Sequence, residues 1–181
     1  MVKRTIQLVT LALAAVGLGC GDGTGPNEGS FAATVSGDLA LSLSGTAVFG
    51  TDEQQAQKFF VIILLRGEPG SVDLDAIAIT RNDTLPPGSG TYDINPVDCD
   101  TCGDEDFAAA FVTIRPAAFG VFESQSGSFA ITSASQDRLD GTFSFAATLN
   151  ELFSFGDINA ENIQLQGSFN ARRDEIPSIG Q

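Results

Sequence analysis

The sequence contains no histidine and no tryptophan, and it has one tyrosine. The absence of histidine excludes the Ser–His and Cys–His nucleophile systems, in which an imidazole takes the proton of the attacking group. It also excludes every metal site that requires an imidazole ligand. Surfaces that stack on sugars or bases usually use Trp and Tyr, so the absence of tryptophan and the single tyrosine argue against such a surface. The fourteen phenylalanines favour a well-filled core instead.

Positive charge is also scarce, because nine Lys and Arg residues stand against twenty-three Asp and Glu residues, giving a formal net charge of -14. This charge repels nucleic acid and anionic lipid surfaces, so we expect neither as a partner. No phosphate loop or dinucleotide fingerprint is present. Asp73, Asp75 and Asp93 lie on or near expected strands, and we expect surface solvation to account for them. We therefore predict that the protein is not an enzyme, with a carboxylate-dependent hydrolase as the weaker alternative.

The N-terminus has the three parts of a secretory signal: the cations Lys3 and Arg4, an uncharged stretch over residues 5–19, and small residues before Cys20. The uncharged stretch is shorter than the roughly 20 residues that a transmembrane helix needs. Residues 16–20, Val-Gly-Leu-Gly-Cys, resemble the lipobox of bacterial lipoproteins, although Gly17 stands where that family usually has leucine. The resemblance implies that the chain is cut after Gly19 and that Cys20 receives a lipid.

Four segments follow from this interpretation: a signal peptide at 1–19, a lipidated cysteine with a Gly-rich tether at 20–30, a single domain at 31–174, and a C-terminal tail at 175–181. The tether lets the domain move on the order of 18 Å from its anchor. Loss of Lys3 and Arg4 takes the formal charge from -14 to -16. We expect the mature protein on the extracytoplasmic side of a bacterial envelope, in the periplasm or at the cell surface.

The domain has the period-two pattern of half-buried strands. Residues 139–149 are the clearest case, because apolar residues or glycine occupy the odd positions, whereas the even ones are mostly polar. Residues 59–65 are apolar throughout, which predicts a strand covered on both faces. Further strands are expected at 31–36, 39–49, 58–66, 72–81, 90–94, 107–114, 126–134 and 163–172, with a short helix or a loop at 151–161. The fold class is therefore all-β: an antiparallel β-sandwich or a partly closed barrel of about eight to ten short strands.

A phrase of glycine, hydroxyl residue and apolar residue recurs in these strands. It begins at Gly45, Gly90, Gly127, Gly141 and Gly167. We expect each glycine to share the inward face with the apolar residue of its phrase, at a bend or a close contact beside a buried aromatic ring. The pattern resembles small exported β-domains of bacterial lipoproteins, and this resemblance implies no particular activity.

The most polar segment runs from Asp98 to Asp106. With Cys20 assigned to lipid, Cys99 and Cys102 are left as a pair that an oxidising compartment would join. The crowded carboxylates oppose a catalytic thiolate, and one cysteine pair without histidine does not suit zinc. Two interpretations stay open: a loose oxygen cage for calcium, or a solvated acidic loop. The cage would use four carboxylates, those of Asp98, Asp100, Asp104 and Asp106.

The sequence thus predicts a lipid-anchored envelope protein that works by binding, with no cofactor except the tentative calcium. Its partner would be a cell-envelope protein or a small ligand. The alternative is a structural envelope protein without a ligand. A pocket lined by phenylalanine would favour binding, whereas a solid core would favour the structural role.

Overall fold

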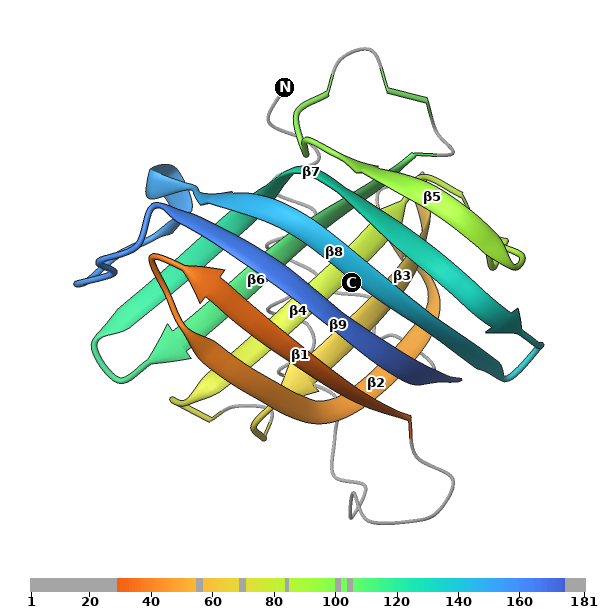
Figure 1. Cartoon of the computed structure of the whole chain (residues 1–181), viewed down its shortest axis with the longest axis horizontal. Coiled ribbons are helices and arrows are strands. Elements are labelled where there is room, and N and C mark those ends of the chain that lie inside the picture. Colours follow the sequence, from red (N-terminus) through yellow and green to blue (C-terminus); the bar gives the residue numbers. More distant parts are fainter. Residues whose placement is uncertain are drawn as a thin grey trace.

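The computed structural model describes residues 29–54, 57–68, 71–83, 85–99, 102–103 and 106–174 (Figure 1). The predictions for the signal peptide, Cys20 and the C-terminal tail lie outside these ranges. The described part of the chain forms nine strands and one short 3-10 helix. These elements are β1 (Ser30–Gly37), β2 (Leu41–Gln54), β3 (Gln57–Arg66), β4 (Leu74–Arg81), β5 (Gly90–Asn95), β6 (Phe107–Arg115), β7 (Ala118–Ala134), β8 (Arg138–Leu149), η2 (Glu151–Phe153) and β9 (Asn162–Arg173).

The nine strands form one sheet that closes on itself as a barrel, in the order β1-β2-β3-β4-β6-β5-β7-β8-β9. The all-β prediction is confirmed, and of its two alternatives the closed sheet is the one observed. Most neighbours are antiparallel, but β5 runs parallel to β6, and β2 meets β9 over a short parallel contact. These parallel contacts differ from the fully antiparallel sheet that the sequence predicted.

The interior of the closed sheet is filled by apolar side chains. Along β1 and β8 the buried positions alternate with positions that are more open to solvent, as the period-two pattern predicted. Seven phenylalanines are among the largest side chains that are completely buried: Phe49, Phe60, Phe107, Phe111, Phe122, Phe129 and Phe145. A closed sheet of about eight strands has an interior just wide enough for side chains to fill. The phenylalanine-rich composition is therefore explained by this core.

Four of the recurring glycines lie directly opposite a phenylalanine on the neighbouring strand. The pairs are Gly45 with Phe31, Gly127 with Phe145, Gly141 with Phe169, and Gly167 with Phe143. A Cβ atom on Gly141 would lie 2.6 Å from the Phe169 ring, and one on Gly167 would lie 2.8 Å from the Phe143 ring. The glycines thus leave room for aromatic rings that lie across the inner surface. The expected close contact with a buried aromatic residue is confirmed for Gly127, Gly141 and Gly167. It is not found at Gly45, where a Cβ atom would meet the Leu65 backbone, or at Gly90, which is exposed and has the half-buried Tyr92 as its nearest neighbour.

Strands β1, β8 and β9 lie on one side of the closed sheet, and β3, β4 and β6 lie on the other (Figure 1). The outward side chains of these two groups of strands differ. We call the outward side chains of β1, β8 and β9 the polar wall, because they are mainly Ser, Thr, Gln and Asn. We call the outward side chains of β3, β4 and β6, together with Val48 of β2, the apolar wall. Residues 59–65 of β3 are at most 8% exposed, which confirms that this strand is covered on both faces. Residues 107–112 of β6 are buried at every position as well.

Strand β7 is longer than predicted, since it begins at Ala118 and not at Ser126. Its first half forms a hairpin with β6 across Pro116 and Ala117, and its second half pairs with β5. Ser124 lies at the change of partner and is fully buried. Its hydroxyl accepts a hydrogen bond from the Ala109 N–H (3.0 Å) and donates one to the Asn95 carbonyl (2.7 Å). One side chain therefore satisfies backbone groups where the strand ladder is interrupted.

Candidate functional site

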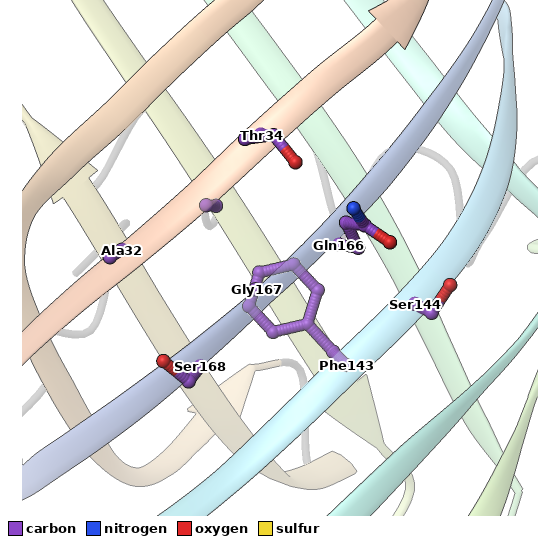
Figure 2. A pocket seen from close by; sticks show the side chains of 8 residues that line it. Ala32, Thr34, Phe143, Ser144, Gln166, Gly167 and Ser168 are labelled. Atoms are coloured by element: carbon purple, nitrogen blue, oxygen red, sulfur yellow. The ribbon is translucent and has the colours of Figure 1, made fainter.

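A shallow groove of about 510 Å³ crosses the polar wall (Figure 2). Its rim carries Thr34 from β1, Gln166 from β9 and Ser144 from β8, which are aligned in one cross-strand row. Ala32 and Ser168 continue the rim, and the five rim side chains are all exposed. The rim therefore offers hydroxyl and amide groups without a formal charge.

The floor of the groove is made by residues of the neighbouring row, in which Ala33, Gly167 and Phe143 are aligned. Gly167 has no side chain, and the Phe143 ring lies against its inner side (Figure 2). Phe143 is only 3% exposed, so the ring belongs to the core. The groove is thus a surface feature above a filled interior, and its chemistry is hydrogen bonding by short polar side chains. The alternating sequence pattern predicted that these residues would be exposed. It did not predict that Thr34, Gln166 and Ser144 would be aligned, because each of them comes from a different strand.

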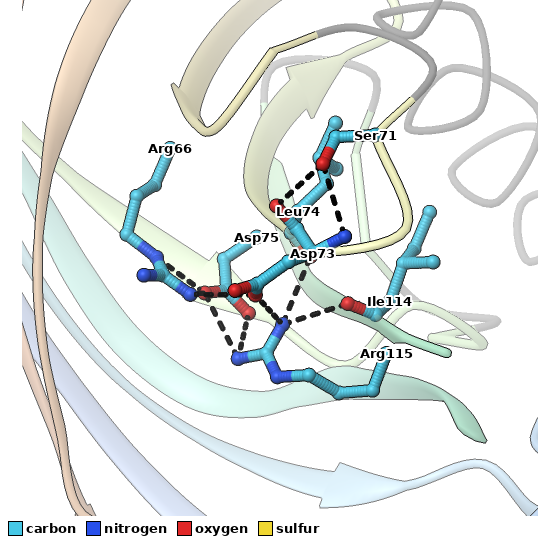
Figure 3. Close-up of polar contacts among 7 residues, drawn as sticks. All are labelled: Arg66, Ser71, Asp73, Leu74, Asp75, Ile114 and Arg115. Atoms are coloured by element: carbon cyan, nitrogen blue, oxygen red, sulfur yellow. Dashed lines mark hydrogen bonds and ion pairs between the residues drawn. The ribbon is translucent and has the colours of Figure 1, made fainter. Parts of the chain in front are cut away.

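A second cluster closes one end of the interior, where Asp75 lies between Arg66 and Arg115 (Figure 3). The Arg66 Nε donates to Asp75 Oδ2 at 2.6 Å. The Arg115 Nη2 donates to both carboxylate oxygens of Asp75, at 3.0 and 3.2 Å. Asp73 lies further out, with its Oδ1 at 3.1 Å from Arg115 Nη1 and at 3.3 Å from Arg66 Nη2.

Burial separates the two aspartates of this cluster. The Asp75 side chain is inaccessible to solvent, whereas that of Asp73 is 63% exposed. The expectation that solvation accounts for Asp75 is therefore wrong, because two guanidinium groups replace water around it. The two carboxylates balance the two arginines, and every oxygen of Asp75 is used in an ion pair. The arrangement is that of an ion-pair cluster that closes the end of the core, and it suits this structural role more than acid–base chemistry.

Arg81 closes the other end of the same core, six residues further along β4. Its Nη2 donates to Asp83 Oδ2 (3.0 Å) and to the Leu85 carbonyl (2.8 Å). Its guanidinium lies 5.5 Å from the centre of the Phe107 ring, within cation–π distance. Arg81 thereby ties the connection between β4 and β5 to the end of the filled interior.

In the acidic segment, Cys99 and Cys102 form a disulfide with a Cα–Cα distance of 5.5 Å. The predicted pair is therefore joined. Asp98 is exposed, and Asp106 Oδ2 accepts a hydrogen bond from the Gly103 N–H at 2.7 Å. Asp100 and Asp104 lie outside the described residues. Calcium binding stays a prediction: a rise in melting temperature with calcium would select the cage, and an unchanged midpoint would select the solvated loop.

The connection between β8 and β9 begins with η2 and carries two exposed apolar side chains, Leu152 (91%) and Phe155 (66%). Its far end is held by Asp38, whose Oδ2 accepts hydrogen bonds from the backbone N–H groups of Asn162 (2.9 Å) and Glu161 (3.0 Å). These two bonds, that from Asn162 first, lower the pKa of Asp38 because they favour its ionised form.

Among the residues that the structure describes, no helix has the length and apolar character needed to cross a membrane. The chain matches no protein-family model, no curated protein and no solved structure.

Proposed function

We propose that the protein is a lipid-anchored, extracytoplasmic component of a bacterial envelope that binds an envelope partner without catalysis. The N-terminal signal and the lipobox-like residues before Cys20 support the anchor. The disulfide between Cys99 and Cys102 supports an oxidising compartment and leaves Cys20 as the unpaired third cysteine of the chain.

The observation that carries the binding role is the groove across the polar wall. In a chain with a formal net charge of -14, its rim is formed by uncharged side chains. Thr34, Gln166 and Ser144 present donors and acceptors in one row, and the strands beneath them are fixed by a continuous ladder of backbone hydrogen bonds. This surface suits a neutral, polar segment of an envelope protein. It suits a sugar less well, because no aromatic side chain is exposed in it.

The anchor is tested by cell fractionation of the full chain and its Cys20→Ser variant. The wild-type protein should sediment with membranes, and the variant should appear in the soluble extracytoplasmic fraction or keep its signal peptide. A variant that is cut and still sediments like the wild type would contradict the lipid anchor.

Binding by the groove is tested with a photo-crosslinking residue placed at Gln166 in cells. We expect one discrete product of higher mass, and we expect a second substitution, Ser144→Arg, to remove it by placing a large charged group in the row. The matched control carries the crosslinker at Thr132, which is exposed on β7 outside the groove. A product of the same size from Thr132, or a product that Ser144→Arg leaves unchanged, would contradict a specific partner.

A structural role as an envelope spacer is the second candidate, and the filled interior favours it. Most of the phenylalanine side chains are buried together in one core inside the closed sheet. The crosslinking experiment separates the two candidates, because a spacer predicts no discrete product from either position.

A further inference from the structure

The connection between β8 and β9 carries two large apolar side chains that are exposed to solvent, Leu152 and Phe155. The Phe155 ring stacks on the half-buried ring of Phe119, with 5.6 Å between the ring centres. Phe119 lies at the start of β7, so the connection and the β6–β7 hairpin contribute to one surface. We call Leu152, Phe155 and Phe119 the apolar patch.

Hydrogen bonds fix the backbone beneath the apolar patch. Phe119 and Phe155 each donate an N–H to the carbonyl of the other, at 2.9 and 2.8 Å. The Asn150 Oδ1 accepts a hydrogen bond from the Leu152 N–H at 3.0 Å and thereby caps η2. The Ser154 hydroxyl donates to the Asn150 carbonyl at 2.7 Å. The backbone is therefore ordered before a partner arrives, which lowers the entropic cost of binding.

The core does not require the two exposed side chains. Neither Leu152 nor Phe155 belongs to any of the buried apolar clusters formed by the described residues. Polar residues at these positions would be solvated without loss of core packing, whereas exposed leucine and phenylalanine are unfavourable in water. Exposed apolar side chains on a preorganised backbone are typical of contact sites.

The charge around the apolar patch indicates the chemistry of its partner. Residues 150–161 include Glu151, Asp157 and Glu161, which are all exposed, and contain no lysine or arginine. Asp38 adds a fourth carboxylate beside them, since its Oδ2 accepts a hydrogen bond from the Glu161 N–H. A partner that covers the patch must therefore carry positive charge next to its apolar residues. The same carboxylates repel a second copy of this chain and an anionic bilayer.

The size of the apolar patch favours a short segment over a folded partner. A stable complex between folded proteins buries about 800 Å² on each side. Two exposed side chains and one half-buried ring supply only a small part of that area. A short amphipathic segment needs only a few apolar anchors on one of its faces, and basic residues beside those anchors would match the charge.

We propose that the apolar patch is a docking site for a short, cationic and amphipathic segment of a protein partner. The apolar side chains of that segment contact Leu152 and Phe155. Its lysine or arginine residues lie beside Glu151 and Asp157. This docking site shares no residue with the groove of the polar wall.

The test measures binding of a labelled synthetic peptide by fluorescence anisotropy. The protein is the full chain carrying Cys20→Ser, which is studied without detergent. The probe is a short helical peptide of leucine and lysine with the leucines along one face, and its control has glutamate in place of lysine. We expect the lysine peptide to bind and the glutamate peptide not to bind. Equal binding of the two peptides, or no binding of the lysine peptide, would overturn the proposal.

A matched pair of substitutions locates the bound peptide. We expect Leu152→Ser to weaken binding of the lysine peptide about tenfold, because the contact with one leucine side chain is lost. Leu85→Ser is the control and should bind as the wild type does, since Leu85 is also exposed but lies on the β4–β5 connection. Unchanged binding by Leu152→Ser, or an equal loss in Leu85→Ser, would overturn the proposal.

A variant with both Glu151→Gln and Asp157→Asn tests the charge and covers the case in which Leu152→Ser does not fold. We expect it to bind the lysine peptide about threefold more weakly at low salt and like the wild type in about 1 M salt, where charges are screened within about 3 Å. Wild-type affinity at low salt would overturn the proposal.

Two further measurements on the same protein distinguish the other possible occupants of the apolar patch. Sedimentation velocity reports self-association, and flotation with phosphatidylcholine vesicles reports binding to a bilayer. We expect neither. A dimer or a vesicle-bound form that Leu152→Ser abolishes would assign the patch to a second copy or to lipid and would overturn the proposal.

Discussion

The polar and apolar walls are built on the same interior, and they differ first in what the strands carry on their outer face. In β8 and β9 every second residue except Ala146 is polar, so each strand buries one face and solvates the other. At residues 59–65 of β3 and 108–112 of β6 the outward positions are apolar as well, and both faces are buried. The inward residues are apolar in both halves and form the shared core of the closed sheet. The outward residues differ between the halves, so they determine which side of the molecule is solvated.

The two halves also close their shared core differently. The strands of the polar wall use glycines opposite phenylalanines, which let rings lie flat across the inner surface. The strands of the apolar wall end in charged groups that point inward, with Asp75, Arg66 and Arg115 at one end and Arg81 at the other. Substitutions at one such residue in each half separate the two contributions.

The largest effect should come from Asp75 in the apolar half. We expect Asp75→Asn to lower the free energy of unfolding by about 3 kcal/mol, the low end for a broken buried ion pair because both arginines keep about a third of their surface exposed. Urea unfolding measures the change. The matched control is Asp73→Asn, whose exposed carboxylate should contribute less than about 1 kcal/mol. Similar losses in the two variants would mean that the cluster is a surface network.

A smaller loss should come from Gly141 in the polar half. The Cβ atom of Gly141→Ala would lie 2.4 Å from the Ala130 carbonyl oxygen and 2.6 Å from the Phe169 ring. We expect a loss of about 2 kcal/mol, because an overpacked core must shift its rings or its backbone. Gly90→Ala is the control, since its nearest neighbours are Tyr92 side-chain atoms at 3.7 Å. If Gly141→Ala unfolds like the control, the glycine–phenylalanine pairing does not constrain the core.

The smallest effect concerns Asp38, which joins the turn after β1 to the start of β9. Its pKa is lowered in the folded state, so its contribution to stability is complete above the ordinary carboxyl pKa of about 3.9 and is lost as the pH falls through the lower, folded value. We expect Asp38→Asn to melt slightly below the wild type at pH 7 and to approach it in strong acid. Thermal melts at several pH values test this, and a constant difference across the whole range would contradict the assigned hydrogen bonds.

The sequence predicted most of the strands because alternation is a local signal. It placed the inward residues of β8 and β9 correctly, and the run at residues 59–65 predicted a strand buried on both faces. It did not predict that β6 would lie between β4 and β5, because uniformly apolar strands carry no signal for their neighbours. The first half of β7 was missed for a related reason: residues 118–125 pair with β6 through a turn at Pro116, and their own pattern alternates weakly.

The candidate sites were harder to predict, since their partners are distant in the chain. Asp75 resembled a surface carboxylate in the sequence, and its burial depends on Arg66 and Arg115, which lie 9 and 40 positions away. One signal in the sequence pointed to these partners. The chain has only nine Lys and Arg residues, and three of them, Arg66, Arg81 and Arg115, each stand at the end of an apolar strand. The groove could not be predicted either, because Thr34, Gln166 and Ser144 come together only when β9 lies between β1 and β8.

The anchor at Cys20 matters most, because the proposed location of the protein follows from it. The most direct measurement is the intact mass of the protein extracted from the membranes of cells that express the full chain. The account predicts residues 20–181 with a diacylglycerol, and further acyl groups, on Cys20. A mass of 18.8 kDa, which is that of the unprocessed chain, or a cut chain without lipid would contradict it.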